Sequence, residues 1–246
     1  MTKDKKASKS TYSPKILSVQ EIVEQNKRII SGKLSGSNIK KLNNFNWLRH
    51  EISYTEPRIL FWRNIKEQSP YFDYSCTKGL GDAYDYMLEQ TQKKVPLDIR
   101  EICNIHYLIC NERTIKINDS QIRPGVIKKT NVPMEIETAL ENIIYRYQTS
   151  EKPAIIRAFD MHYQIIELQA FDDYNKRTAR IIMNWALLEN GYRPIVFTRK
   201  TDKESYPAAL LNMKRNDTKS YYKYMYNAMR ASQEKIIAQL KSSNIK

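Results

Sequence analysis

Apolar residues recur every three to four positions along most of the chain, which is the spacing of amphipathic helices. In the stretch "SVQEIVEQNKRIISG", Ser18 and Glu21 form a capping-box pair and Gly32 stands at the end. Residues 153–168 are apolar on almost every side and predict the most buried helix. Further helices are predicted over residues 79–94, 96–112, 133–148, 176–190 and 218–240, with two short ones within 43–65. The pattern therefore predicts an all-α fold.

Residues 113–133 depart from the helical pattern. Ile115 and Ile117 alternate with polar residues, an Asn-Asp-Ser turn follows, and Ile122 and Val126 lie beyond it. This arrangement predicts an irregular β-hairpin. A single hairpin is marginally stable by itself, so it must pack against the helices, and loops of this kind commonly carry binding sites. We therefore expect one small β-hairpin on an otherwise helical bundle.

The length and composition limit the classes of protein that fit. A chain of 246 residues can bury one sizeable core, and its six Gly disfavour hairpin-rich all-β folds and glycine-cradled phosphate loops. No apolar run approaches the ~18 residues of a membrane span, and the basic N-terminus lacks the apolar stretch of a secretory signal. Three Cys in so long a chain favour a reduced, cytoplasmic protein with no membrane partner. We expect a disordered basic arm over residues 1–15, an N-terminal helical extension over 16–95 and the core, with the C-terminal helix, over 96–246.

The formal net charge of +14 raises the question of nucleic-acid binding. The basic residues are spread along the chain, however, and no helix-turn-helix or zinc-finger spacing is present. The segment "YYKYMYNAMR" places Tyr222, Met225, Tyr226 and Met229 on one helical stripe, which is more typical of a core than of a base-stacking surface. Nucleic acid therefore stays a distant alternative as partner.

Carboxylates, amides and cations crowd the segment "QAFDDYNKRTAR", residues 169–180, which opens onto a strongly helical run. Arg177 and Arg180 are three residues apart and project from one face of the first helical turn. The unpaired N–H groups of a helix start favour an anion, and two guanidinium groups can grip a polyphosphate. An Asp beside a polyphosphate is a suitable Mg²⁺ ligand. The segment fits a phosphate site, and equally a solvated, salt-bridged helix start.

The same segment resembles the motif of the Fic (Fido) family, H-x-F-x-[DE]-G-N-G-R-x-x-R, which opens the family's central helix. "LLENGYRPIVF" and "SYPAALLNMKRND" are similar to later family elements, and "SQIRPGVIKKTNVP" stands where the family has its β-hairpin flap. The likeness covers roughly residues 80–240. The family's His, Phe, acid, Asn, first Arg and second Arg positions are occupied by Gln169, Phe171, Asp173, Asn175, Arg177 and Arg180.

The resemblance implies an all-α, Fic-like helical bundle with one small β-hairpin flap, and an activity that moves AMP from ATP to a Ser, Thr or Tyr hydroxyl of a protein. It implies ATP and Mg²⁺ as cofactors, with Asp173 holding the metal, and His162 and Phe171 as structural residues. The catalytic positions would be Gln169, Asn175 and Arg177. The phosphate-binding set would be Asn175, Lys176, Arg177 and Arg180. The flap would align a target or regulatory protein by strand addition through Gln121, Ile122, Arg123 and Val126.

The chain departs from the family motif at three positions. Gln169 replaces the His that acts as general base, and its amide does not take up a proton near neutral pH. A positioned base contributes ~10²–10⁴ in rate, so the ordinary reaction should be crippled. Tyr174 and Lys176 replace the two Gly of the anion-binding turn, where Gly permits a positive φ. We therefore predict a catalytically impaired protein that acts as a binding or regulatory module.

An active nucleotidyl- or phospho-transferase is the alternative. "NKRTA" resembles the Doc toxins, a Fic-related branch that has Lys at the second Gly position and uses ATP as a phosphate donor. Those toxins keep the His that this chain lacks. Asp172 could substitute as the base, although its side chain is expected to point to solvent or to cap the helix. His162 lies two helical turns back, ~10 Å away, which is too far to act as the base. We expect it to be buried and hydrogen-bonded.

Cys103, His106 and Cys110 fall on one face of a predicted helix and raise the question of a zinc site. Seven helical residues separate the two Cys by ~10 Å, whereas two ligands of one Zn²⁺ lie only ~4 Å apart. We therefore interpret all three as core or half-buried residues.

Overall fold

The computed structural model of the protein describes residues 18–33, 70–110, 116–117, 120–121, 123–128, 133–197 and 199–242. Helices dominate this part of the chain, so the predicted all-α fold is confirmed. No helix within it has the length and apolar character that a membrane crossing needs. The elements are α1 (Val19–Lys33), α5 (Pro70–Gln92), α6 (Ile99–Ile109), β1 (Lys116–Ile117), β2 (Ser120–Gln121), α7 (Pro133–Thr149), α8 (Ala154–Leu168), α9 (Asn175–Glu189), α10 (Arg199–Lys214) and α11 (Thr218–Ser242).

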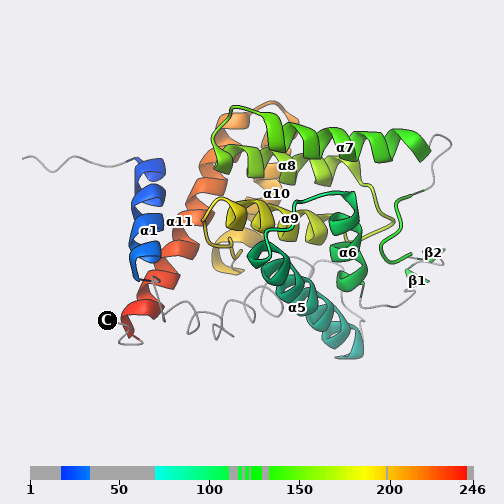
Figure 1. Ribbon diagram of the computed structural model, residues 1–246, viewed down its shortest axis with the longest axis horizontal. Coiled ribbons are helices and arrows are strands. Elements are labelled where there is room, and N and C mark those ends of the chain that lie inside the picture. The colour runs from blue at the N-terminus through cyan, green and yellow to red at the C-terminus, as the bar shows by residue number, and fades with distance from the viewer. Residues whose placement is uncertain are drawn as a thin grey trace, which may run out of the picture.

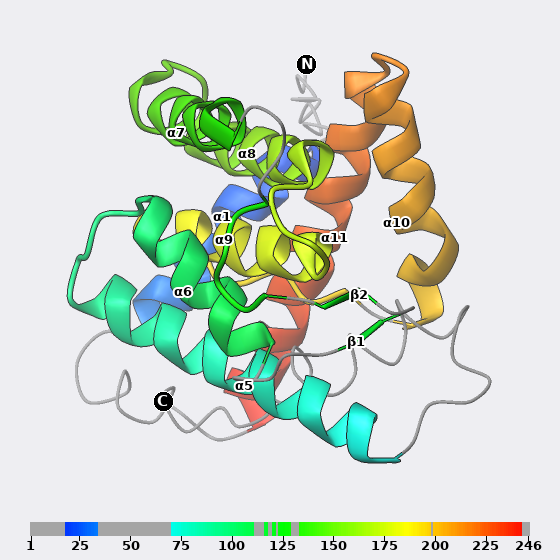
Figure 2. The ribbon, with the colours of Figure 1, turned by 90° about the vertical axis from the view of Figure 1, so that its right-hand side faces the viewer.

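Helix α9 forms the centre of the bundle. It packs against α8, α5 and α6, which surround it in both views (Figure 1, Figure 2). Every residue from Arg177 to Leu187 is buried, whereas α8 leaves Tyr163, Gln164 and Glu167 partly or fully exposed. The prediction that residues 153–168 form the most buried helix is therefore wrong. The reason is that α9 buries two Arg, a Thr and two Asn, which lower its hydropathy without bringing it to the surface.

Helix α5 begins at Pro70, nine residues before the helix predicted from Gly79. Gly79 lies inside this helix. The position requires Gly because a Cβ there would meet the carbonyl oxygens of Leu108 and Ile109 at 2.6 Å. The glycine allows close approach of α5 and the end of α6 at a cost of about 1 kcal/mol in helix propensity.

Helix α1 packs against α11, far along the chain, and hydrogen bonds hold it there. Helices α1 and α11 pack along each other, at the blue and red ends of the chain in Figure 1. The Lys27 ammonium donates to the carbonyl oxygen of Asn190 at 2.8 Å, and the Gln233 amide donates to the carbonyl oxygen of Val23 at 3.2 Å. The capping box is present, with the Ser18 N–H donating to the Glu21 carboxylate at 2.7 Å. The division into an extension over 16–95 and a core over 96–246 stays a prediction, and the predicted arm over 1–15 lies outside the described residues.

The predicted hairpin region contains a short antiparallel pair. Strands β1 and β2 pair with Lys116 opposite Gln121 and Ile117 opposite Ser120. Ile122 lies outside the described residues, and the structure resumes at Arg123. Whether this region acts as a flap for a partner protein stays a prediction.

The segment after α9 is attached to that helix by one buried amide. Asn184, 1% exposed, donates to the carbonyl oxygen of Ile195 at 3.1 Å and accepts from the Ile195 N–H at 2.8 Å. This pair of bonds fixes the return of the chain along the central helix.

Replacing Asn184→Ala should lower the free energy of unfolding by about 2–4 kcal/mol, because both backbone groups of Ile195 would stay buried without a partner. Urea denaturation measures the change. Asn142→Ala, an exposed position on α7, is the matched control and should change stability by less than about 0.5 kcal/mol. Equal effects of the two substitutions would contradict the assignment.

Candidate active site

The segment 169–180 forms the loop between α8 and α9 and the first turns of α9, and two left-handed residues bracket the loop. Gln169 has φ 50° and ψ 47°, and Tyr174 has φ 57° and ψ 9°. Neither is Gly, and a side chain in this region costs about 1–2 kcal/mol. Tyr174 therefore takes the positive φ expected at the first glycine position of the motif. Lys176 does not, because it lies inside α9.

The Asn175 side chain closes this loop. Its amide donates to the Phe171 carbonyl oxygen at 2.8 Å and accepts from the Phe171 N–H at 2.9 Å. It also donates to the side-chain oxygen of Gln169 at 3.4 Å. Asn175 is only 4% exposed. The residue predicted to bind phosphate thus has both ends of its amide committed to the loop.

Gln169 occupies the position where the motif has its general base. Its side-chain amide donates to the backbone carbonyl oxygen of Ile166, and its oxygen accepts from Asn175. The amide is therefore turned back onto the end of α8. It is neutral and already hydrogen-bonded, so it is not suited to accept a proton from a hydroxyl group.

The two arginines of the motif are buried. Arg177 is 3% exposed, and its guanidinium carbon lies 4.3 Å from the centre of the Tyr174 ring, which is itself buried. Arg180 is 2% exposed, with its guanidinium 5.9 Å from the Tyr206 ring. Aromatic rings thus lie against both predicted phosphate-binding groups as cation–π partners.

Asp173 and Lys176 are both exposed and lie at the start of α9. The carboxylate of Asp173 accepts from the Tyr174 N–H at 2.6 Å, so one of its oxygens stabilises the turn. Among the described residues, no three His, Cys, Asp or Glu side chains group as metal ligands. A Mg²⁺ ion held by Asp173 would need phosphate oxygens as its other ligands. The Tyr174 ring over Arg177 does not fit a polyphosphate at that place.

The segment that follows the hairpin lies against the loop. Asp172 accepts from the Arg123 guanidinium at 3.2 Å and from the Arg123 N–H at 3.3 Å. The Lys128 N–H donates to the Ala170 carbonyl oxygen at 2.9 Å. Asp172 is exposed, as expected, and its carboxylate also pairs with Arg123 of the segment 123–128. Val126, another predicted flap residue, is 42% exposed, and no side-chain position is described for Gln121.

His106 connects three elements at the site. Its Nδ1 accepts from the Gly125 N–H at 2.9 Å, so the ring proton lies on Nε2, which donates to the Asp173 carbonyl oxygen at 3.1 Å. The ring stacks on Phe171 with centroids 3.9 Å apart. Burial lowers the pKa of His106 to about 4. The sequence analysis placed His106 in the core without linking it to the site, and no local motif marks these contacts.

Gly125 has φ 70°, and a Cβ there would come within 3.2 Å of Tyr107 and 3.1 Å of the Cys103 carbonyl oxygen. Only Gly allows this segment to approach α6 closely enough for the bond to His106.

His162 lies in the core below the loop and is fully buried. The Tyr221 hydroxyl donates to the Phe159 carbonyl oxygen at 2.8 Å and therefore accepts from His162 Nδ1 at 3.0 Å. The Tyr206 hydroxyl donates to Nε2 at 2.9 Å. Burial, with a further contribution from Arg180, lowers the pKa of His162 to about 3. Both nitrogens are engaged, and the ring is neutral.

The two buried histidines should make stability fall in mild acid. Each folded-state pKa lies below the unfolded value of about 6.5, so the unfolded chain binds protons first as the pH falls. The stability due to neutral His106 is complete above about pH 6.5 and is lost progressively toward about pH 4.

His106→Asn should reduce the slope of unfolding free energy against pH by about 1.4 kcal/mol per pH unit near pH 5. Urea denaturation between about pH 7.5 and 4.5 measures the slope, and the parent chain is the reference. An unchanged slope would show that His106 titrates alike in the folded and unfolded states.

Comparison with known proteins shows which family the segment 96–187 is similar to. Residues 96–187 match the sequence model of the Fic/DOC family. Two proteins named protein adenylyltransferase fic-1, from Caenorhabditis briggsae and Caenorhabditis elegans, are each 26% identical to this chain over 160 residues. The match covers 60% of this chain and 30% of each relative, so the chain spans less than a third of their length. A protein adenylyltransferase Fic from Nematostella vectensis is 25% identical over 181 residues, covering 68% of this chain and 40% of the relative.

Solved structures share the fold at lower identity. Fic-1 from C. elegans superposes with a TM-score of 0.73 at 16% identity, over 89% of this chain and 70% of that chain. A Fic domain containing signaling protein from Bacteroides thetaiotaomicron superposes with a TM-score of 0.72 at 18% identity, over 92% and 98% of the two chains. Residues 96–187 therefore match the Fic/DOC family in sequence, and the described part of the chain shares the fold of solved Fic proteins.

Proposed function

We propose that this protein is a Fic-fold binding or regulatory module whose transferase reaction is impaired. The observation that carries the proposal is the buried Tyr174 ring, 4.3 Å from the guanidinium carbon of Arg177. The relatives are named protein adenylyltransferases, which implies ATP as their substrate. In this chain, a phosphate group reaching Arg177 would have to displace the ring from the cation it covers.

The proposal is also supported by the lack of a proton acceptor beside the loop. Gln169 carries an amide that is already bonded to Ile166 and Asn175. Asp172, the carboxylate considered as a substitute, is paired with Arg123. His106 and His162 have both ring nitrogens engaged and pKa values well below neutrality. In the described part of the site, none of these groups is placed to take the proton from a target hydroxyl group.

The segment 123–128 is the surface that we propose for a protein partner. Arg123, Gly125 and Lys128 are anchored to Asp172, His106 and Ala170 respectively, so the segment has a fixed conformation. Val126 is 42% exposed between these anchors. A rigid segment loses little conformational entropy on binding, which favours recognition of an extended peptide along it.

An active phosphoryl or nucleotidyl transferase is the second candidate, and the exposure of Lys176 favours it. Lys176 lies in the first turn of α9 beside the exposed Asp173, where a cation and a helix start can both attract an anion. A nucleotide bound there would use Lys176 rather than Arg177.

Calorimetry with Mg²⁺-ATP separates the two candidates. The parent chain should bind Mg²⁺-ATP weakly, with a Kd of about 1 mM or higher. Tyr174→Gly should raise the affinity by about tenfold or more, because it uncovers Arg177 and places Gly at a positive φ. Adding Arg177→Ala to that variant should abolish the gain. Lys176→Ala is the matched control for the second candidate. Made in the parent chain, it should leave the affinity for Mg²⁺-ATP unchanged.

Transfer to protein hydroxyls should appear only after the base is restored as well. The double variant Gln169→His with Tyr174→Gly should incorporate label from ATP at least about a hundredfold faster than the parent, since a positioned base contributes ~10²–10⁴. Mass spectrometry identifies the transferred group. Micromolar binding and transfer by the parent chain, both lost in Lys176→Ala, would overturn the proposal in favour of the second candidate.

A further inference from the structure

A groove of about 420 Å³ lies between the start of α6 and the middle of α7, and no residue of the 169–180 segment lines it. In Figure 1, α7 runs along the top of the molecule with α6 below it. The apolar side chains of Leu97, Ile99 and Ile144 line the groove. Tyr145 also lines it and is 64% exposed, the largest exposed fraction among the large hydrophobic residues of the described part of the chain. The groove thus offers apolar surface and an accessible aromatic ring.

The groove is negatively charged, although the chain carries a formal net charge of +14. Asp98 and Arg100 neutralise each other, since the Arg100 guanidinium donates to the Asp98 carboxylate at 2.9 Å. Glu137 and Glu141 are exposed in the lining, and neither pairs with a cation within the described part of the chain. They are four residues apart on one face of α7, where like charges repel each other. Three carboxylates against one cation leave an excess of two negative charges.

The two glutamates differ in this respect from other carboxylates on the described helices. On α5, Glu89 pairs with Lys93 at 2.6 Å, four residues away. At the corresponding positions before and after the two glutamates, α7 has Pro133 and Tyr145. The chain has 41 Lys and Arg residues, so a shortage of cations does not explain the difference. The two carboxylates are therefore available as acceptors beside the apolar surface.

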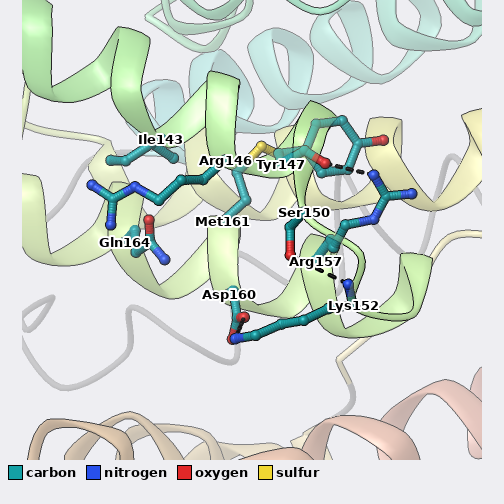
Figure 3. A pocket seen from close by; sticks show the side chains of 9 residues that line it. All are labelled: Ile143, Arg146, Tyr147, Ser150, Lys152, Arg157, Asp160, Met161 and Gln164. Atoms are coloured by element: carbon teal, nitrogen blue, oxygen red, sulfur yellow. Dashed lines mark hydrogen bonds and ion pairs between the residues drawn. The ribbon is translucent and has the colours of Figure 1, made fainter.

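A smaller pocket at the end of α7, of about 220 Å³, has a different arrangement of charge. Figure 3 shows the side chains of Arg146 and Arg157 on opposite sides of it. Its Lys152 pairs with Asp160 at 2.7 Å. This pocket does not direct its charges toward one ligand, whereas the groove between α6 and α7 carries its two unpaired carboxylates on one helix face.

We infer that the groove binds an extended, basic segment of a partner protein. Glu137 and Glu141 are about 6 Å apart along the axis of α7, at 1.5 Å per residue. Alternate residues of an extended peptide lie about 6.6 Å apart and point to the same side, so two Lys or Arg separated by one residue match the two carboxylates. The aliphatic stems of these side chains pack on the apolar lining, and a cation can lie over the Tyr145 ring. This surface is separate from the 169–180 loop, so its test does not depend on the function proposed for that loop.

A labelled synthetic peptide, Ala-Lys-Ala-Lys-Ala-Leu, tests the groove by fluorescence anisotropy with the full chain at low ionic strength. The parent chain should bind it, and should not bind the peptide in which Gln replaces both Lys. The double variant Glu137→Gln with Glu141→Gln should weaken binding by about tenfold or more, because it removes both charge-assisted hydrogen bonds. The matched control is Glu151→Gln with Glu204→Gln, which removes the same charge at exposed positions outside the groove. It should bind the peptide as the parent does.

Tyr145→Ala should weaken binding by about threefold or more, whereas Tyr145→Phe should preserve it, because the aromatic ring makes the contact. Circular dichroism verifies that each variant folds. Absence of peptide binding by the parent, or equal binding by the parent and the Glu137 and Glu141 double variant, would overturn the proposal. Dimers in analytical ultracentrifugation that the same double variant abolishes would also overturn it, and would assign the groove to a second copy of this chain.

Discussion

The two hydrogen bonds between the Asn175 amide and the Phe171 backbone are the constraint on which the rest of the site depends. They close the loop between α8 and α9 and thereby place the Phe171 ring against His106, 3.9 Å away. His106 in turn binds the Gly125 N–H, which positions the flap segment. A series of contacts thus runs from one side chain at the start of the central helix through the loop to α6 and the segment 123–128. The hydrogen bonds of Asn175 within the loop also explain why its side chain is buried. A side chain that binds phosphate would instead be accessible to the ligand.

Much of the fold was predictable from the sequence, because local patterns encode it. The spacing of apolar residues predicted every described helix except α10, and the capping box at Ser18 and Glu21 is present in the structure. The burial of α9 was not predictable, since Arg177 and Arg180 lower its hydropathy and only the packing of the surrounding helices brings them inside. The start of α5 at Pro70 was not predicted. The lack of a side chain at Gly79 serves an approach between α5 and α6, which the sequence does not show.

The candidate site likewise has features that were predictable from the sequence and features that were not. The spacing of the motif located the loop and the helix start, since these residues are contiguous in the chain. The pairing of Asp172 with Arg123, 49 residues apart, and the bonds from His106 to Gly125 and Asp173 depend on tertiary structure. No spacing rule reports such contacts. The sequence therefore identified the residues of the loop, while the structure alone showed that several of them bind one another.

Tyr at position 174, where the family motif has Gly, changes the stability of the loop little. A non-Gly residue in the left-handed region costs about 1–2 kcal/mol. A desolvated guanidinium over an aromatic ring contributes about 2 kcal/mol, and the buried ring adds apolar contact. These terms are of similar size and opposite sign, so Tyr174 can cover Arg177 without destabilising the loop. The contact between the Tyr174 ring and Arg177 therefore links the stability of this loop to the loss of nucleotide binding that we propose.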